Sequence, residues 1–106
     1  MTSSLYSPAW FVDVCDTILA IDLALSGSRN VDTWRRDLQH ARENLRELRN
    51  DISQDSRYAD NESLLHGLVD ATAFLTQALR TPKVSRSDLV NAVMILRTLR
   101  DERRDA

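Results

Sequence analysis

The side chains of this sequence that could most readily take part in catalysis or binding are two histidines and the acids and arginines near them. An imidazole can transfer protons near neutral pH or bind a metal, and it usually needs a carboxylate or a carbonyl to orient it. His66 and Asp70 are four residues apart, so on a helix they would lie one turn from each other. A metal-binding bundle needs Glu-x-x-His ligands on facing helices, and the sequence contains none. We therefore interpret His66 and Asp70 as a surface pair, and we expect no metal and no cofactor.

Asp22 is the acid with the most unusual surroundings. It falls within the apolar run from Ala9 to Leu25, and on a helix it would lie opposite Asp13. A carboxylate among apolar side chains must be paired, protonated or functional. If this helix forms an antiparallel hairpin with the next one, positions whose numbers sum to about 57 lie level, which places Asp22 beside Arg35. A buried ion pair is commoner than a buried general base, so the pattern predicts an Asp22–Arg35 pair.

A short segment places an arginine five residues before a histidine, in the order RRDLQH from Arg35 to His40. Over these six residues the chain resembles the R-x4-6-H motif of HEPN-type helical ribonucleases. In that family, the arginine and histidine of two protomers meet in a dimer cleft and cleave RNA without a metal. The resemblance implies that Arg35 and His40 would be catalytic. Arg36 departs from the family pattern, which usually has a polar, non-basic residue there, and the alternative is two solvated side chains on one helix.

Arginine supplies thirteen of the fourteen basic residues of the chain. Its planar guanidinium binds carboxylates and phosphates in a bidentate manner that lysine cannot match. Arg35, Arg42 and Arg49 recur every seven residues, so they would share one side of a helix and, with Asp22, could bind a small anionic ligand such as a nucleotide. We do not expect nucleic-acid binding, because acids alternate with these arginines and no aromatic residue lies among them.

All of these residues fall on four segments whose apolar side chains have helical spacing. The second segment is the most regular, because its apolar residues recur at alternating steps of three and four from Val31 to Ile52. This spacing is an unbroken heptad seam, which buries one narrow stripe against neighbouring helices. Asn61 and Ser85 are suitable N-terminal caps for the third and fourth helices. The predicted helices span residues 8–26, 31–53, 62–80 and 86–103.

Four helices with three short links predict an all-α fold, an up-down-up-down four-helix bundle that forms one domain over residues 1–106. The first helix is apolar almost all round, apart from a narrow polar stripe of Asp13, Asp16 and Thr17. The fourth helix is also apolar beyond one stripe. Excess apolar surface of this kind is usually buried in an oligomer, so we expect a homodimer. The expected interface residues are Phe11, Cys15, Ile18, Leu19, Val90 and Met94.

The composition limits the possible functions further. The net charge of −2 demands no polyanionic partner, and the single cysteine, Cys15, allows no disulfide within the chain. The first apolar run holds three aspartates and is too short to span a bilayer, so we expect a cytoplasmic protein without a membrane partner. The expected function is a small, non-enzymatic regulatory module that binds another protein through helix faces. The ribonuclease and the binder of an anionic ligand stay as alternatives.

Overall fold

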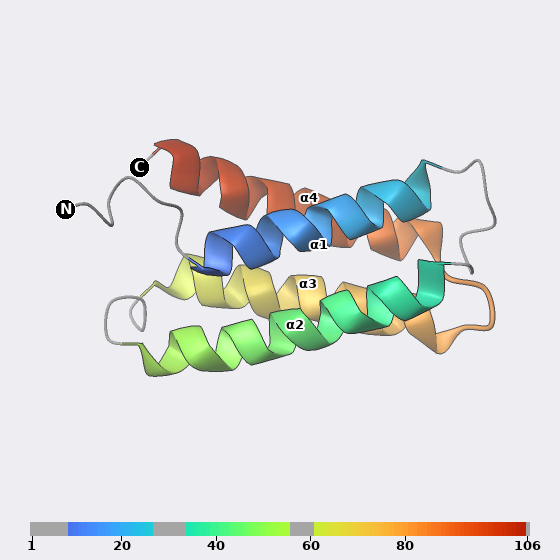
Figure 1. Ribbon diagram of the computed structural model, residues 1–106, viewed down its shortest axis with the longest axis horizontal. Coiled ribbons are helices and arrows are strands. Elements are labelled where there is room, and N and C mark those ends of the chain that lie inside the picture. The colour runs from blue at the N-terminus through green and yellow to red at the C-terminus, as the bar shows by residue number, and fades with distance from the viewer. Residues whose placement is uncertain (1–8, 27–33, 56–60, 106) are drawn as a thin grey trace.

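The computed structural model describes residues 9–26, 34–55 and 61–105 of the chain, and every regular element in these ranges is a helix (Figure 1). The prediction of an all-α protein is therefore confirmed. The predicted range of the third helix coincides with that in the structure, and the fourth helix extends two residues further. Residues 31–33, where the second helix was expected to begin, lie outside the described residues. The helices are α1 (Ala9–Leu25), α2 (Arg35–Gln54), α3 (Glu62–Arg80) and α4 (Arg86–Asp105).

The four helices lie side by side along the long axis of the molecule (Figure 1). Contacts join α1 to α2, α2 to α3, α3 to α4, and α4 back to α1. Each helix therefore has two neighbours, one on either flank, and turns its remaining side to solvent. This arrangement decides which side chains of a helix can meet, because residues on opposite flanks of α1 face different helices. Among the described residues, no helix is both long enough and apolar enough to cross a membrane.

The core lies between the four helices and is filled by their apolar stripes. The heptad seam predicted for the second helix is buried at every one of its positions within α2. Thr17 is also buried, although the sequence placed it in a polar stripe with Asp13 and Asp16. Its hydroxyl donates a hydrogen bond to the carbonyl oxygen of Asp13 at 2.9 Å, which removes most of the cost of burying it. The buried α2 residues are Leu38, Ala41, Leu45, Leu48 and Ile52.

Side-chain caps hold the beginnings of α3 and α4. The side-chain oxygen of Asn61 accepts a hydrogen bond from the backbone N–H of Leu64 at 3.1 Å, as the sequence predicted. Ser85 Oγ accepts from the backbone N–H of Asp88 at 3.4 Å, and the backbone N–H of Ser85 donates to the carbonyl oxygen of Ala78 at 3.3 Å. The second bond ties the start of α4 to the end of α3. It closes the short α3–α4 turn and sets the two helices beside each other.

α3 and α4 pack closely at Gly67. A Cβ atom built on this glycine would lie 2.8 Å from both δ-methyl carbons of Leu99. Leu99 is itself buried, so it has little room to move away. A glycine in the middle of a helix is unfavourable by about 1 kcal/mol relative to alanine, and close packing against Leu99 accounts for its presence here.

Candidate functional site

Arg35 holds the turn between α3 and α4. Its Nη1 donates a hydrogen bond to the carbonyl oxygen of Leu79, and its Nη2 donates to those of Thr81 and Pro82, each at 2.8 Å. These carbonyls belong to the last turn of α3 and the residues after it, where the helix leaves acceptors without partners. A cation at this position also interacts favourably with the helix dipole. The structure therefore gives Arg35 a structural task within its own chain.

His40 lies on the other flank of α2, where it is exposed and faces α1. It lines an open hollow of about 390 Å³ between the two helices. Arg36, one turn before His40, lines this hollow, whereas Arg35 points to the opposite side of α2. Within one chain, the two residues of the ribonuclease-like motif therefore share no site. The remaining lining residues are Asp16, Thr17, Ala20, Asp37, Ala41 and Asn44.

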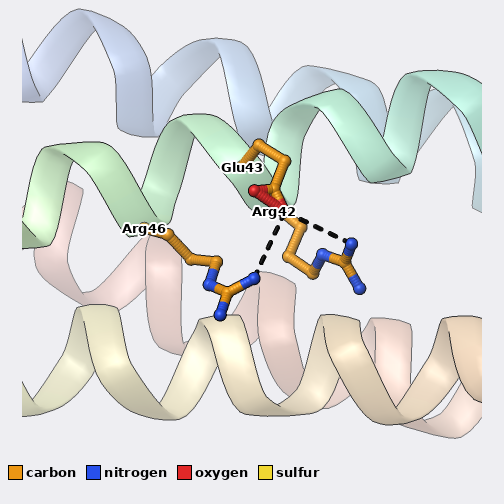
Figure 2. A network of polar contacts seen from close by, with 3 residues as sticks. All are labelled: Arg42, Glu43 and Arg46. Atoms are coloured by element: carbon orange, nitrogen blue, oxygen red, sulfur yellow. Dashed lines mark hydrogen bonds and ion pairs between the residues drawn. The ribbon is translucent and has the colours of Figure 1, made fainter.

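Arg42 and Arg49 each have a partner on α2 itself. Arg42 Nη2 and Arg46 Nη1 both lie 3.3 Å from the same carboxylate oxygen of Glu43, and Figure 2 shows this small network. Arg49 Nη2 donates to the side-chain oxygen of Asn50 at 2.9 Å. Successive arginines in the series from Arg35 to Arg49 begin about 10 Å apart along the helix. Their guanidinium groups contact separate partners, and the structure does not gather them around one anion.

Asp22 has a different partner from the one that the sequence predicted. Its Oδ1 lies 2.8 Å from Nη2 of Arg97 on α4, and the side chains of the pair are 39% and 45% exposed. The predicted Asp22–Arg35 pair and its burial are both wrong, because Asp22 lies on the α4 flank of α1. Ala20 and Asp37, whose numbers sum to 57, line the same hollow.

Five large apolar side chains stand exposed on α1 and α4. Leu19 and Met94 are 57% and 59% exposed, and the others are between 41% and 49%. Ile18, which was expected at an interface, is only 5% exposed and belongs to the core, so that expectation is wrong. Phe11 packs partly against the core, and Cys15 is half-buried. The expected interface residues other than Ile18 are Phe11, Cys15, Leu19, Val90 and Met94, and we call them the α1–α4 apolar surface.

Carboxylates gather on the opposite flank of α1, where it faces α2. Burial, followed by repulsion from Asp16 and then from Asp51, raises the pKa of Asp13 above its usual value. Asp37 lies two seven-residue steps before Asp51, on the same flank of α2, and lines the hollow beside Asp16. Among the residues that the structure describes, no ion pair or side-chain hydrogen bond holds Asp16 or Asp37. We call Asp13, Asp16, Asp37 and Asp51 the acidic groove.

The two flanks of α2 therefore carry opposite charges. Arg35, Arg42 and Arg49 lie on the α3 flank, while Asp37 and Asp51 lie on the α1 flank. The arginines are engaged within the molecule, whereas the acids look outward from the groove. Sequence reasoning singled out the arginines by their seven-residue spacing. It missed that carboxylates of α1 and α2 would lie near one another beside a single arginine of the hollow, Arg36, since that depends on which helix covers which flank.

His66 and Asp70 are both exposed on α3. Within the described parts of the chain, no group of three or more histidine, cysteine, aspartate or glutamate side chains is placed to hold a metal ion. Comparison of the chain with protein-family models, curated proteins and solved structures found no match. The features that bear on function are therefore the α1–α4 apolar surface and the acidic groove.

Proposed function

We propose that this protein is a small, non-enzymatic interaction module of the cytoplasm, an up-down-up-down helical bundle that forms a homodimer and binds another protein through its helix faces. A single observation carries the proposal: the exposure of large apolar side chains on the neighbouring helices α1 and α4. Isolated exposed apolar residues are normal on protein surfaces, but a continuous group of them marks an interaction site. The polar residues that might catalyse a reaction are engaged in structural contacts or lie apart.

The size of the α1–α4 apolar surface suits self-association. The two helices contain 17 and 20 residues, so together they present a face about 25–30 Å long and about 20 Å wide. This face of about 500–600 Å², of which the α1–α4 apolar surface is a part, lies somewhat below the roughly 800 Å² per partner of a standard interface. The Asp22–Arg97 ion pair within this face is internally neutral, so it does not repel a second copy. Two such faces packed together would cover Leu19, Val90 and Met94.

The molar mass in solution tests the proposed dimer. We expect the wild-type chain to have twice the mass of a 12.1 kDa protomer by light scattering. The Met94→Glu variant should be a folded monomer, because burying an unpaired carboxylate would weaken association by about a hundredfold or more. Val69→Glu is the matched control, because Val69 is similarly exposed but lies on α3.

Two results would contradict the dimer. One is a wild-type monomer at concentrations well above a micromolar dissociation constant, which a standard interface readily reaches. The other is equal dissociation by Val69→Glu and Met94→Glu, which would show that the α1–α4 apolar surface is not specific. Circular dichroism of each variant would establish that it retains its helices, so that a change in mass reports association alone.

A further inference from the structure

The outward side of α1 carries a second recognition feature, a short seam with coiled-coil spacing. Val12, Asp16, Leu19 and Leu23 follow one another at steps of four, three and four residues, and all four side chains are exposed. This is the spacing with which one helix packs along another. We call these residues the α1 outer seam. Val12 and Leu23 lie about 60–80° round the helix from Cys15, on the side of Leu19 away from α4.

Asp16 makes this seam negatively charged. Its carboxylate stands between the apolar positions of the seam and borders the hollow that also contains Asp37 and His40. The rest of the acidic groove runs alongside, and Arg36 is the only cation on the hollow's lining. Within the described ranges, Asp16 has no ion-pair partner. A helix that covered the seam would remove water from this carboxylate and would have to supply a compensating charge.

A second copy of α1 cannot supply that charge. In a parallel pairing of two outer seams, Asp16 would face Asp16 of the second copy, so that two carboxylates would repel each other at the interface. In an antiparallel pairing that matches the seam residues, Asp16 would face Leu19 of the second copy and would be desolvated without a partner. Polar residues at seam positions commonly select partners in this way, by penalising the wrong pairings.

We propose that the α1 outer seam binds an amphipathic helix of a different protein, with apolar side chains against Val12, Leu19 and Leu23 and an arginine or lysine against Asp16. The basic side chain extends into the hollow between α1 and α2, where the carboxylate of Asp37 also lies within the lining. The proposal rests on the proposed function, since it names the kind of protein that the module binds. It shares Leu19 with the α1–α4 apolar surface, but it requires none of the α4 residues of the proposed dimer.

Two synthetic helical peptides of about 20 residues, added to the full chain, test this proposal. Both carry leucines at the spacing of the seam, and they differ only at the position facing Asp16, which is arginine in one and glutamate in the other. Fluorescence anisotropy measures their binding. We expect the arginine peptide to bind wild type about tenfold more tightly than the glutamate peptide, with a preference that weakens as salt is added.

Variants decide whether Asp16 is the cause of the preference. Asp16→Arg should reverse the order of the two peptides, and Leu23→Glu should weaken both. Asp70→Arg is the control, because Asp70 is an exposed aspartate on α3, and the wild-type order should persist in it. An unchanged order in Asp16→Arg, or no binding of either peptide to both wild type and the Met94→Glu variant, would overturn the proposal. So would a wild-type dimer that Leu23→Glu dissociates, because a second copy would then occupy the seam.

This test and that of the proposed dimer fail separately. A wild-type monomer that prefers the arginine peptide would refute the dimer and support the α1 outer seam. Because the dimer would cover Leu19, the peptides are also added to the monomeric Met94→Glu variant. A Met94-dependent dimer whose Met94→Glu monomer binds neither peptide would support the dimer and refute the seam. The two readouts are distinct because one measures the mass of the protein alone and the other measures binding of an added helix.

Discussion

Replacing Arg35 with alanine removes three hydrogen bonds to backbone carbonyls in one step. Hydrogen bonds to charged groups contribute about 1.5–3 kcal/mol when one partner is deleted, but two of these three are exposed and water can replace them. We therefore expect Arg35→Ala to lower the free energy of unfolding by about 1–2 kcal/mol. For a chain of 106 residues, the entropy of unfolding is about 0.22 kcal/mol/K, so Tm should fall by about 5–9 °C.

Thermal unfolding followed by circular dichroism measures this change. Arg49→Ala is the matched control, because Arg49 is also on α2 but, among the described residues, bonds only to the neighbouring Asn50. Its Tm should stay within about 1 °C of wild type. Arg35→Lys keeps the charge without the planar fork, so it should give an intermediate Tm. Equal values of Tm for Arg35→Ala and Arg49→Ala would refute the view that Arg35 stabilises the α3–α4 turn.

Two further predictions concern stability. The folded state raises the pKa of Asp13, so it holds this proton more tightly than the unfolded chain and loses that stabilisation as the pH rises through the folded pKa. Asp13→Asn should therefore raise the free energy of unfolding at pH 7 by less than about 1 kcal/mol, with a matching rise in Tm. The gain should shrink in acid, and an equal gain at pH 3 would contradict this prediction. Gly67→Ala should lower the free energy of unfolding in urea by about 1 kcal/mol, because overpacking against Leu99 costs more than the helix gains. A more stable Gly67→Ala variant would show that Leu99 moves aside freely.

Local patterns in the sequence were enough to predict the helices. The heptad seam of α2 is buried from Leu38 to Ile52, since a narrow apolar stripe has only one favourable environment. Asn61 caps α3 as predicted, because the cap depends only on residues within one turn. In both cases the stabilising contacts are decided by spacing along a single helix, and spacing is what the sequence displays directly.

The partners between helices could not be predicted in the same way. Asp22 and Arg97 are 75 residues apart, and their pairing depends on α4 lying beside the flank of α1 that carries Asp22. The hairpin argument assigned the wrong neighbouring helix to this flank of α1. The burial of Thr17 could not be predicted either. Its hydroxyl makes it a polar residue by type, but the hydrogen bond to the carbonyl oxygen of Asp13 in the preceding turn allows it to be buried.

The two flanks of α2 differ in charge, and this difference gives the helix a transverse electric dipole. Its negative side coincides with the acidic groove and the adjoining α1 outer seam, while the arginines of the α3 flank form the positive side. A positively charged helix would therefore be attracted toward the seam before any contact forms, over distances up to about 10 Å at 0.1 M salt. Added salt would slow such an encounter while leaving the apolar contacts intact. The same field would turn two copies of this protein so that their acidic grooves face apart.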